Sequence, residues 1–205
     1  MSDENEIKKV KLDWNEHYKE TPMEKLHWYA DELDPEVPPS LAKYCPECST
    51  VLDLGTGPGT AAIEFTKLGF SVTATDISQA AIDMAKERAD NFADKIDFIV
   101  DDIRDSIIED KFDIIHDRGC FHVLDKAGID QYLDHVPSLL NENGILLLKT
   151  FSTREVDQQG PNRYNTGLIE DIFSDVFKII YSEETVYPST LPVDPKALFC
   201  VLTHV

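Results

Sequence analysis

The stretch Val51-Leu-Asp-Leu-Gly-Thr-Gly-Pro-Gly-Thr60 decides the fold. A short apolar strand, Thr50–Leu54, ends in this glycine-containing loop, and a helical pattern follows from Thr60 to Leu68. Glycine lets the backbone turn tightly and approach a ligand closely. The first strand–helix turn of an open α/β sheet is also a common place for a cofactor. The stretch therefore predicts a cofactor-binding turn between a first strand and a first helix.

Downstream of this loop, short apolar or β-branched strands alternate with helical stripes, which predicts a parallel sheet covered on both faces. A tail follows in which a Pro-containing loop, rather than a helix, joins two strands that should pair antiparallel. We predict a doubly wound α/β fold with a mostly parallel seven-stranded sheet, an antiparallel last strand and helices on both faces. The remaining predicted strands are Ser71–Asp76, Ile96–Val100, Phe112–His116, Ile145–Phe151, Phe177–Glu183 and Ala197–Thr203. The predicted helices run from Ser78, as N-cap, to about Asn91, along the stripe Ile129–Leu140 up to Asn141–Gly144, and over Thr166–Phe173.

The N-terminal part differs from the rest in its large aromatic residues and its prolines. We predict one or two short helices around Trp14, Tyr18 and Trp28, then a proline-rich loop over Asp31–Ser40 and a further helical piece over Ser40–Tyr44. Residues 1–47 are expected to form a helical cap or lid, and residues 48–205 the core, within a single domain overall.

The composition of the chain limits the kinds of partner that it is expected to bind. The 205 residues suit one compact domain, and the hydrophobic content of 42% indicates a folded chain. The formal net charge of −20 argues against DNA or RNA as a substrate, because nucleic-acid binding depends on clustered Lys and Arg. No apolar run has the roughly 18–20 residues that would span a bilayer, and the acidic N-terminus does not resemble a secretory signal. We expect a cytoplasmic protein without a membrane partner; the oligomeric state stays open.

The four cysteines do not form a metal-binding pattern. Cys45-Pro-Glu-Cys48 has a spacing that can bind metal or exchange thiols, but Cys120 and Cys200 stand alone. The motif also precedes a strand, whereas a thioredoxin-like motif follows one. We therefore predict no metal site and interpret Cys45 and Cys48 as ordinary thiols in a loop.

The glycine loop also limits the kind of cofactor. Thr60 stands where a dinucleotide fingerprint would have its third glycine, and no Gly-Lys-Ser/Thr follows as in a P-loop. Asp53 lies two residues before Gly55, where a carboxylate would disfavour a pyrophosphate and favour a cationic ligand.

Two further acidic residues follow the next strands. Asp76 ends the second strand, where a carboxylate can accept hydrogen bonds from both ribose hydroxyls, as it does in NAD enzymes. Asp101 and Asp102 follow the third strand, and we favour Asp102 for the adenine amino group because Ile103 can cover the ring. A loop-end Asp can also simply cap a helix, but three carboxylates at three successive strand ends argue for an adenosine cofactor with a cationic group.

These residues resemble the class I, Rossmann-like S-adenosylmethionine-dependent methyltransferases. The resemblance spans about residues 48–155 and rests on four motifs. It implies that Asp53, Gly55, Thr56, Gly57 and Gly59 hold the methionine part, that Asp76 and Ile77 hold the ribose, and that Asp102 and Ile103 bind adenine. S-adenosylhomocysteine would be the product. The motifs are Asp53-Leu-Gly-Thr-Gly-Pro-Gly59, Asp76-Ile77, Asp102-Ile103 and Phe112-Asp-Ile-Ile-His-Asp-Arg-Gly119.

A looser resemblance concerns the methyl acceptor. Asp117-Arg-Gly-Cys-Phe-His122, with Trp14, Tyr18 and Trp28 upstream, is similar to the thiopurine- and tellurite-type branch, which implies a small-molecule acceptor and an N-terminal lid. The motif of enzymes that methylate exocyclic amines of bases, or glutamine, is absent. The acceptor stays open among thiols, amines, hydroxyls and metalloid anions. The alternatives are a protein or RNA methyltransferase, a non-catalytic binding protein and a nucleotide-dependent oxidoreductase, which the glycine spacing disfavours.

Several residues outside the glycine loop are candidates for catalysis or for binding the substrate or cofactor. His122 is the candidate general base, because its unperturbed pKa is near neutrality and it should lie at the rim of the sheet; packing is its other interpretation. Asp117 could contact the cofactor's ammonium group, and Arg118 and Arg163 are candidates for recognising an anion. His116 lies inside a strand and is interpreted as structural. Trp14 and Tyr18, with Trp28, could surround the sulfonium through cation–π attraction or anchor the N-terminal helix.

Overall fold

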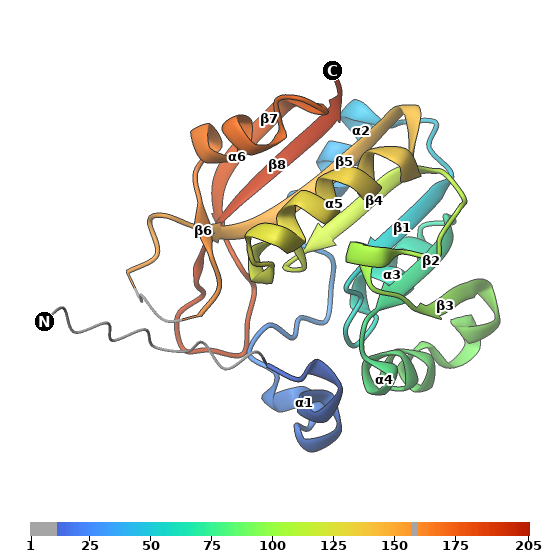
Figure 1. Cartoon of the computed structure of the whole chain (residues 1–205). Coiled ribbons are helices and arrows are strands. Elements are labelled where there is room, and N and C mark those ends of the chain that lie inside the picture. The colour runs from blue at the N-terminus through green and yellow to red at the C-terminus, as the bar shows by residue number, and fades with distance from the viewer. Residues whose placement is uncertain (1–11, 157–159) are drawn as a thin grey trace, which may run out of the picture.

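The computed structural model describes residues 12–156 and 160–205, so the first eleven residues of the expected cap lie outside the described part. One mixed sheet runs through the molecule in the order β3-β2-β1-β4-β5-β8-β7 (Figure 1). Strands β3, β2, β1, β4 and β5 are parallel, and β8 pairs antiparallel with β5 and with β7. The strands are β1 (Thr50–Leu54), β2 (Ser71–Asp76), β3 (Ile96–Val100), β4 (Phe112–Arg118), β5 (Leu140–Ser152), β7 (Phe177–Val186) and β8 (Lys196–His204).

The doubly wound fold and the antiparallel end of the sheet are confirmed, and one additional strand was not predicted. Strand β6, Arg163–Tyr164, pairs parallel with the end of β5. It has only two residues, too few for a period-2 pattern to be recognised.

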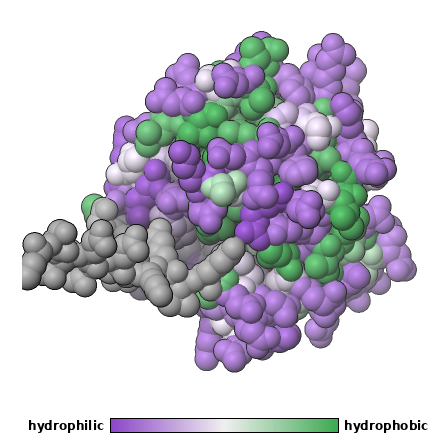
Figure 2. Space-filling model, viewed as in Figure 1, coloured by the Kyte–Doolittle hydropathy of each residue, from purple (hydrophilic) through white to green (hydrophobic). Residues whose placement is uncertain are grey.

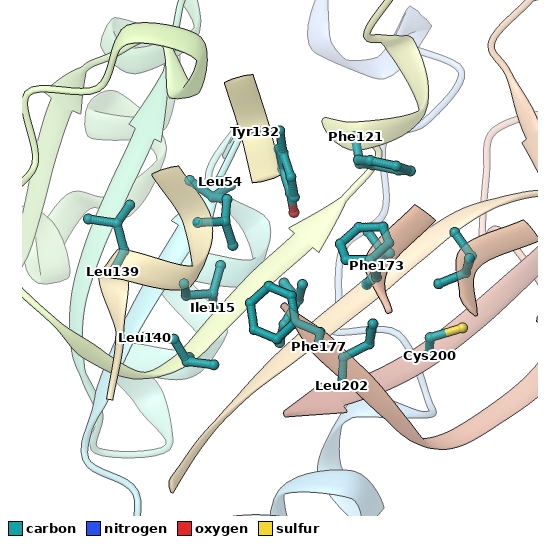
Figure 3. Packing of buried hydrophobic residues seen from close by; sticks show 14 of the residues in the cluster. Leu54, Ile115, Phe121, Tyr132, Leu139, Leu140, Phe173, Phe177, Cys200 and Leu202 are labelled. Atoms are coloured by element: carbon teal, nitrogen blue, oxygen red, sulfur yellow. The ribbon is translucent and has the colours of Figure 1, made fainter. Parts of the chain in front are cut away.

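Helices cover both faces of the sheet (Figure 1). On one face α5 (Lys126–Leu139) and α6 (Thr166–Phe173) bury Tyr132 and Phe173 among the strands, as Figure 3 shows. On the other face α2 (Val37–Tyr44) and α3 (Thr60–Lys67) contribute to a second core. Burial of these apolar faces is the main force that holds helices to a sheet.

Local sequence features explain where helices α4 (Gln79–Ala89) and α2 begin, and the start of the next strand marks where α5 ends. Ser78 caps α4 by accepting a hydrogen bond from the Ala81 N–H at 3.0 Å, as predicted. Helix α2 begins at Val37, earlier than predicted, because prolines fit a first helical turn, where an N–H needs no intrahelical partner. Helix α5 ends at Leu139 and the chain enters β5 at once, so Asn141–Gly144 belongs to the strand rather than to the helix end.

Cys45 and Cys48 depart from the interpretation as ordinary thiols, because they are joined in a disulfide. Their Cα atoms lie 5.3 Å apart, within the range that a disulfide requires. The bridge precedes β1 and lies at the end of the sheet opposite the glycine loop. Among the residues that the structure describes, no group of three or more His, Cys, Asp or Glu side chains could hold a metal ion.

The surface seen in Figure 2 is largely hydrophilic, with smaller hydrophobic patches, in keeping with the net charge of −20. Within residues 12–156 and 160–205, no helix combines the length and the apolar character needed to cross a bilayer.

Candidate functional site

A cavity of about 1810 Å³ lies at the carboxyl ends of β1, β2 and β4. The N-terminal segment, the turn after β4, the region around β6 and the β7–β8 loop complete its walls. Ligand pockets commonly measure about 300–1,000 Å³. The cavity is therefore larger than one cofactor of ordinary size requires, and it has room for a second molecule.

The glycine loop adopts backbone conformations that favour glycine. Gly55, Gly57 and Gly59 have φ angles of 64°, 52° and 78°. A β-carbon on Gly57 would lie 2.7 Å from the Tyr18 hydroxyl oxygen, and one on Gly59 would lie 2.8 Å from the Ala85 Cβ. Gly55 and Gly57 line the cavity with Thr56, whereas Gly59 lets α3 approach α4 closely and does not line it.

Asp53 is held in place by two partners at the cavity wall. It is only 2% exposed; Thr56 donates to its Oδ2 at 2.6 Å, and His116 Nδ1 lies 2.7 Å from its Oδ1. Asp53 and His116 are register partners on β1 and β4, so the pairing of the strands brings them together. The structural interpretation of His116 is consistent with this place, but its contact with Asp53 was not foreseen, because nothing in the sequence gives the strand register.

Asp76 links the ends of β1 and β2. Its Oδ2 accepts the Gly57 N–H at 2.9 Å and its Oδ1 accepts the Ser78 N–H at 2.9 Å. Burial raises the pKa of Asp76 to about 6, against the lowering effect of these two hydrogen bonds. Ile77 beside it is half-exposed and lines the cavity.

The two carboxylates after β3 differ in their contacts. Asp101 accepts from Ser106 Oγ at 2.8 Å and from the Ile107 N–H at 2.9 Å, so it holds the following loop. Asp102 caps the short helix Ile103–Asp105 and forms an ion pair with Arg104. Asp102 and Ile103 both line the cavity.

We expected Asp117 to lie beside the cofactor's ammonium group, but the structure places it away from the cavity. Its side chain is fully buried and does not line the cavity. It accepts hydrogen bonds from the Cys120 and Phe121 N–H groups and from the Tyr132 hydroxyl, the last at 3.0 Å. Asp117 thus fixes the turn after β4, and its carboxylate oxygens are engaged there rather than exposed to the cavity.

His122 lines the cavity but is almost fully buried, with 5% of its surface exposed. Its Nδ1 accepts the Phe151 N–H at 3.2 Å. Burial, and then the charges of Arg118 and Arg163, lower the pKa of His122 to about 3. A general base works best when its pKa is near the working pH, so this environment does not favour that role.

Trp14, Tyr18 and Trp28 form an aromatic cluster over the glycine loop. The ring centroids of Trp14 and Trp28 lie 5.7 Å apart, and Trp28 Nε1 donates to the Tyr18 hydroxyl at 3.2 Å. All three line the cavity. The cluster packs on α4 around Ala81, so it anchors the N-terminal segment as well.

A buried charge cluster holds the N-terminal segment to the sheet. Arg118 Nε donates to Asp34 at 2.8 Å, and Lys149 Nζ lies 3.1 Å from both Asp34 and Glu36. Arg118 also donates to the carbonyl oxygens of Trp28 and Pro188, at 2.9 and 3.0 Å. Arg118 is therefore engaged within the protein and pairs with Asp34 rather than with Asp117.

Arg163, the other candidate for binding an anion, lies on the cavity wall. Its Nη1 donates to the Pro161 carbonyl at 3.1 Å. The arginine belongs to the short strand β6, which places it on the same side of the cavity as His122.

Comparison with known proteins relates this chain to methyltransferases. Residues 51–144 match the family described as "Methyltransferase domain". A putative methyltransferase of Geobacillus sp. is 28% identical over 144 residues, which cover 69% of this chain and 55% of that protein. The chain thus spans about half the length of this curated relative.

Solved structures share the fold. A SAM-dependent methyltransferase from Anabaena variabilis superposes with a TM-score of 0.78 at 21% identity, covering 94% of this chain and 93% of that one. The 1,6-didemethyltoxoflavin-N1-methyltransferase of Burkholderia thailandensis, with bound 1,6-didemethyltoxoflavin and S-adenosylhomocysteine, superposes with a TM-score of 0.68 at 19% identity. That likeness covers 82% of this chain and 77% of the other.

Proposed function

We propose that this chain, which carries a methyltransferase domain of the S-adenosylmethionine-dependent class, transfers a methyl group from that cofactor to a small molecule. The observation that carries the proposal is the single cavity, which joins the glycine loop and the strand-end carboxylates to a further, mostly apolar space. Cofactor and acceptor would lie in one continuous cavity.

Each part of the cofactor has a proposed place. The backbone of Gly55, Thr56 and Gly57, with the Asp53 carboxylate, would hold the methionine part. Asp76 and Ile77 would hold the ribose, and Asp102 and Ile103 the adenine. Gly59 would act indirectly, because it lets α3 approach α4 and so shapes the loop.

The sulfonium is a good leaving group, so the enzyme mainly has to bring the acceptor atom into line with the methyl carbon. The acceptor's electron pair forms the new bond to carbon, and the carbon–sulfur bond breaks to leave S-adenosylhomocysteine. Trp14 and Tyr18 would cover the cofactor, and their ring faces would stabilise the positive charge of its sulfonium through cation–π attraction. An aromatic wall would also keep water away from the reacting atoms.

Two segments that partly cover the cavity favour a small acceptor over a macromolecule. The N-terminal segment and the β7–β8 loop meet over it, where the Thr190 N–H donates to the His27 carbonyl at 3.2 Å. The toxoflavin enzyme described above also binds a small molecule. The acidic surface is a further argument against a nucleic-acid acceptor.

Within the class, we infer a place near the thiopurine- and tellurite-type branch. The inference is supported by Asp117-Arg-Gly-Cys-Phe-His122 and by the aromatic N-terminal segment, which lies over the glycine loop as that branch implies. The acceptor would then be a thiol, an amine, a hydroxyl or a metalloid anion.

The test is labelled methyl transfer to a cell extract that has been separated into small molecules and macromolecules. Purified protein and S-adenosylmethionine with a labelled methyl group are added to each fraction. Label in products of the small-molecule fraction is the expected result. Label confined to protein or RNA would contradict the proposal, and so would the absence of any transfer. An Asp53→Asn variant is the control for contaminating activity, because it keeps the side-chain shape while removing the proposed cofactor contact.

A further inference from the structure

His122 has one ring nitrogen engaged and one directed at the cavity. Nδ1 accepts the Phe151 backbone N–H at 3.2 Å. A nitrogen that accepts a hydrogen bond carries no proton, so the proton of the neutral ring is on Nε2. Nε2 forms no hydrogen bond with any residue of 12–156 or 160–205, although the ring lines the cavity. Because Nε2 has no protein partner and the ring lines the cavity, its N–H is available to a ligand atom that can accept a hydrogen bond.

Gly119 leaves this donor uncovered. The residue has a φ of 101°, and a β-carbon on it would lie 3.3 Å from His122 Nε2. The same position is 4.0 Å from the Tyr187 hydroxyl, which donates to the Lys149 carbonyl at 2.6 Å and so is occupied. The space above Gly119 therefore faces the Nε2–H of His122.

This space adjoins the glycine loop. Cys120 follows Gly119 directly, and its Cβ lies 3.1 Å from where a β-carbon on Gly55 would be. A molecule that accepts a hydrogen bond from His122 would therefore lie beside the proposed site of the methionine part, where the methyl group leaves.

Aromatic and apolar side chains form much of the wall around the donor, with Arg163 on the same side of the cavity. The His122 ring centroid is 5.0 Å from that of Phe151 and 5.9 Å from that of Tyr187, and the latter two are 5.1 Å apart. Leu124, Ile129, Leu133 and Tyr164 also line the cavity. Such walls suit a flat, apolar body.

We propose that His122 is the residue that selects and orients the methyl acceptor, donating a hydrogen bond from Nε2–H to an oxygen or nitrogen atom of a flat, largely apolar molecule. This proposal rests on the proposed function and assigns the same site a substrate class. It replaces the expected general base, because a ring whose Nδ1 is engaged and whose Nε2 already carries the proton has no free electron pair to take another.

The first experiment reads the tautomer directly, by ¹H–¹⁵N correlation spectra of protein with ¹⁵N-labelled histidine, saturated with S-adenosylhomocysteine. We expect a neutral ring with the proton on Nε2 down to about pH 5, where an unperturbed histidine would be charged. A proton on Nδ1, or a ring that becomes charged near pH 6.5 as an ordinary histidine does, would overturn the proposal.

The second experiment uses two probes of similar shape, acetophenone and α-methylstyrene, of which only the first has an oxygen acceptor. Acetophenone should shift the His122 Nε2–H resonance, and α-methylstyrene should not. Equal shifts with both, or none with either, would overturn the proposal. His122→Phe should bind acetophenone about tenfold more weakly, and His122→Gln, which keeps an N–H donor, within about threefold of wild type.

A matched pair of glycine variants separates occlusion of the donor from backbone strain. Gly119→Ala would place a methyl group against Nε2, whereas Gly69→Ala strains a similar backbone, with a φ of 96°, and meets no atom within 4 Å. Only Gly119→Ala should lose acetophenone binding; equal loss in both would contradict the proposal. If the wild-type protein does not bind S-adenosylhomocysteine in a calorimetric titration, the proposed function itself fails, so the two failures are distinguishable.

Discussion

The Tyr18 hydroxyl lies directly against Gly57, so close that a β-carbon on the glycine would stand 2.7 Å from the hydroxyl oxygen. Helix α1 (Trp14–Glu20), which carries Tyr18, therefore contacts the loop that begins the first βα unit. Tyr29 and Ala30 reinforce the contact, since Thr60 donates to the Ala30 carbonyl at 2.7 Å and Arg88 reaches both Thr60 and Tyr29. The N-terminal segment is thus part of the cavity wall.

This contact predicts that Tyr18→Ala weakens the binding of S-adenosylhomocysteine by about tenfold, because it opens the cavity over the glycine loop to water. Loss of one well-packed contact of about 1.4 kcal/mol corresponds to that factor. Isothermal titration calorimetry measures it. Tyr18→Phe keeps the ring and should stay within about threefold of wild type. Unchanged affinity in Tyr18→Ala would show that the segment does not cover the cofactor.

Asp53→Asn should lower the affinity for S-adenosylhomocysteine by about tenfold to a hundredfold, because hydrogen bonds to a charged group contribute about 1.5–3 kcal/mol. The control is Asp113→Asn. Asp113 is also a strand carboxylate, but it accepts from Ser49, Thr50 and Asn141 at the opposite end of the sheet. Binding should be unchanged in the control, and equal losses in both variants would refute the role of Asp53.

The affinity for S-adenosylhomocysteine should fall as the pH drops below about 6. Burial raises the pKa of Asp76 to about 6, so below that pH the free protein is mostly protonated at Asp76. Binding that needs two acceptor oxygens for the ribose then competes with a proton, and the affinity falls by up to about tenfold per pH unit.

In Asp76→Asn, which does not titrate, the affinity should be weaker overall and flat between about pH 5 and 7. Calorimetric titrations at several pH values test both expectations. Parallel pH profiles for the wild type and the variant would assign the dependence to another group.

Lys149→Met should destabilise the fold by about 3–5 kcal/mol, because it leaves the buried carboxylates of Asp34 and Glu36 with one cation fewer. Lys178→Met, an exposed strand position, is the control and should change stability by no more than about 0.5 kcal/mol. Urea unfolding measures both. A loss in Lys149→Met no larger than in the control would mean that the cluster does not stabilise the N-terminal segment.

Much of the fold could be predicted from the sequence, because the strand pattern is strong and local. The bounds of β1, β2 and β3 agree with the predicted runs, since apolar and β-branched residues end where the polar turns begin. Strand β6 and the Cys45–Cys48 bridge could not be predicted in this way, because one is too short for a pattern and the other depends on the fold that brings the two sulfurs together.

The placement of the candidate residues around one cavity could be predicted for the same reason. Topology alone places Asp53, Asp76 and Asp102 at neighbouring strand ends, and they line one cavity. The hydrogen-bond partners of individual side chains could not be predicted in this way. Asp117 bonds to Tyr132 and Arg118 to Asp34, and these residues are distant in sequence, so no local pattern indicates that both side chains are engaged within the protein.

The measurement that tests the central claim most directly is a calorimetric titration of S-adenosylhomocysteine into the wild-type protein. The claim is that the cavity at the glycine loop is a cofactor site. We predict one binding site per chain, with a dissociation constant between about 1 μM and 1 mM, the range common for enzyme ligands. The absence of binding heat at millimolar ligand, or binding that Asp53→Asn and Asp76→Asn leave unchanged, would contradict the claim.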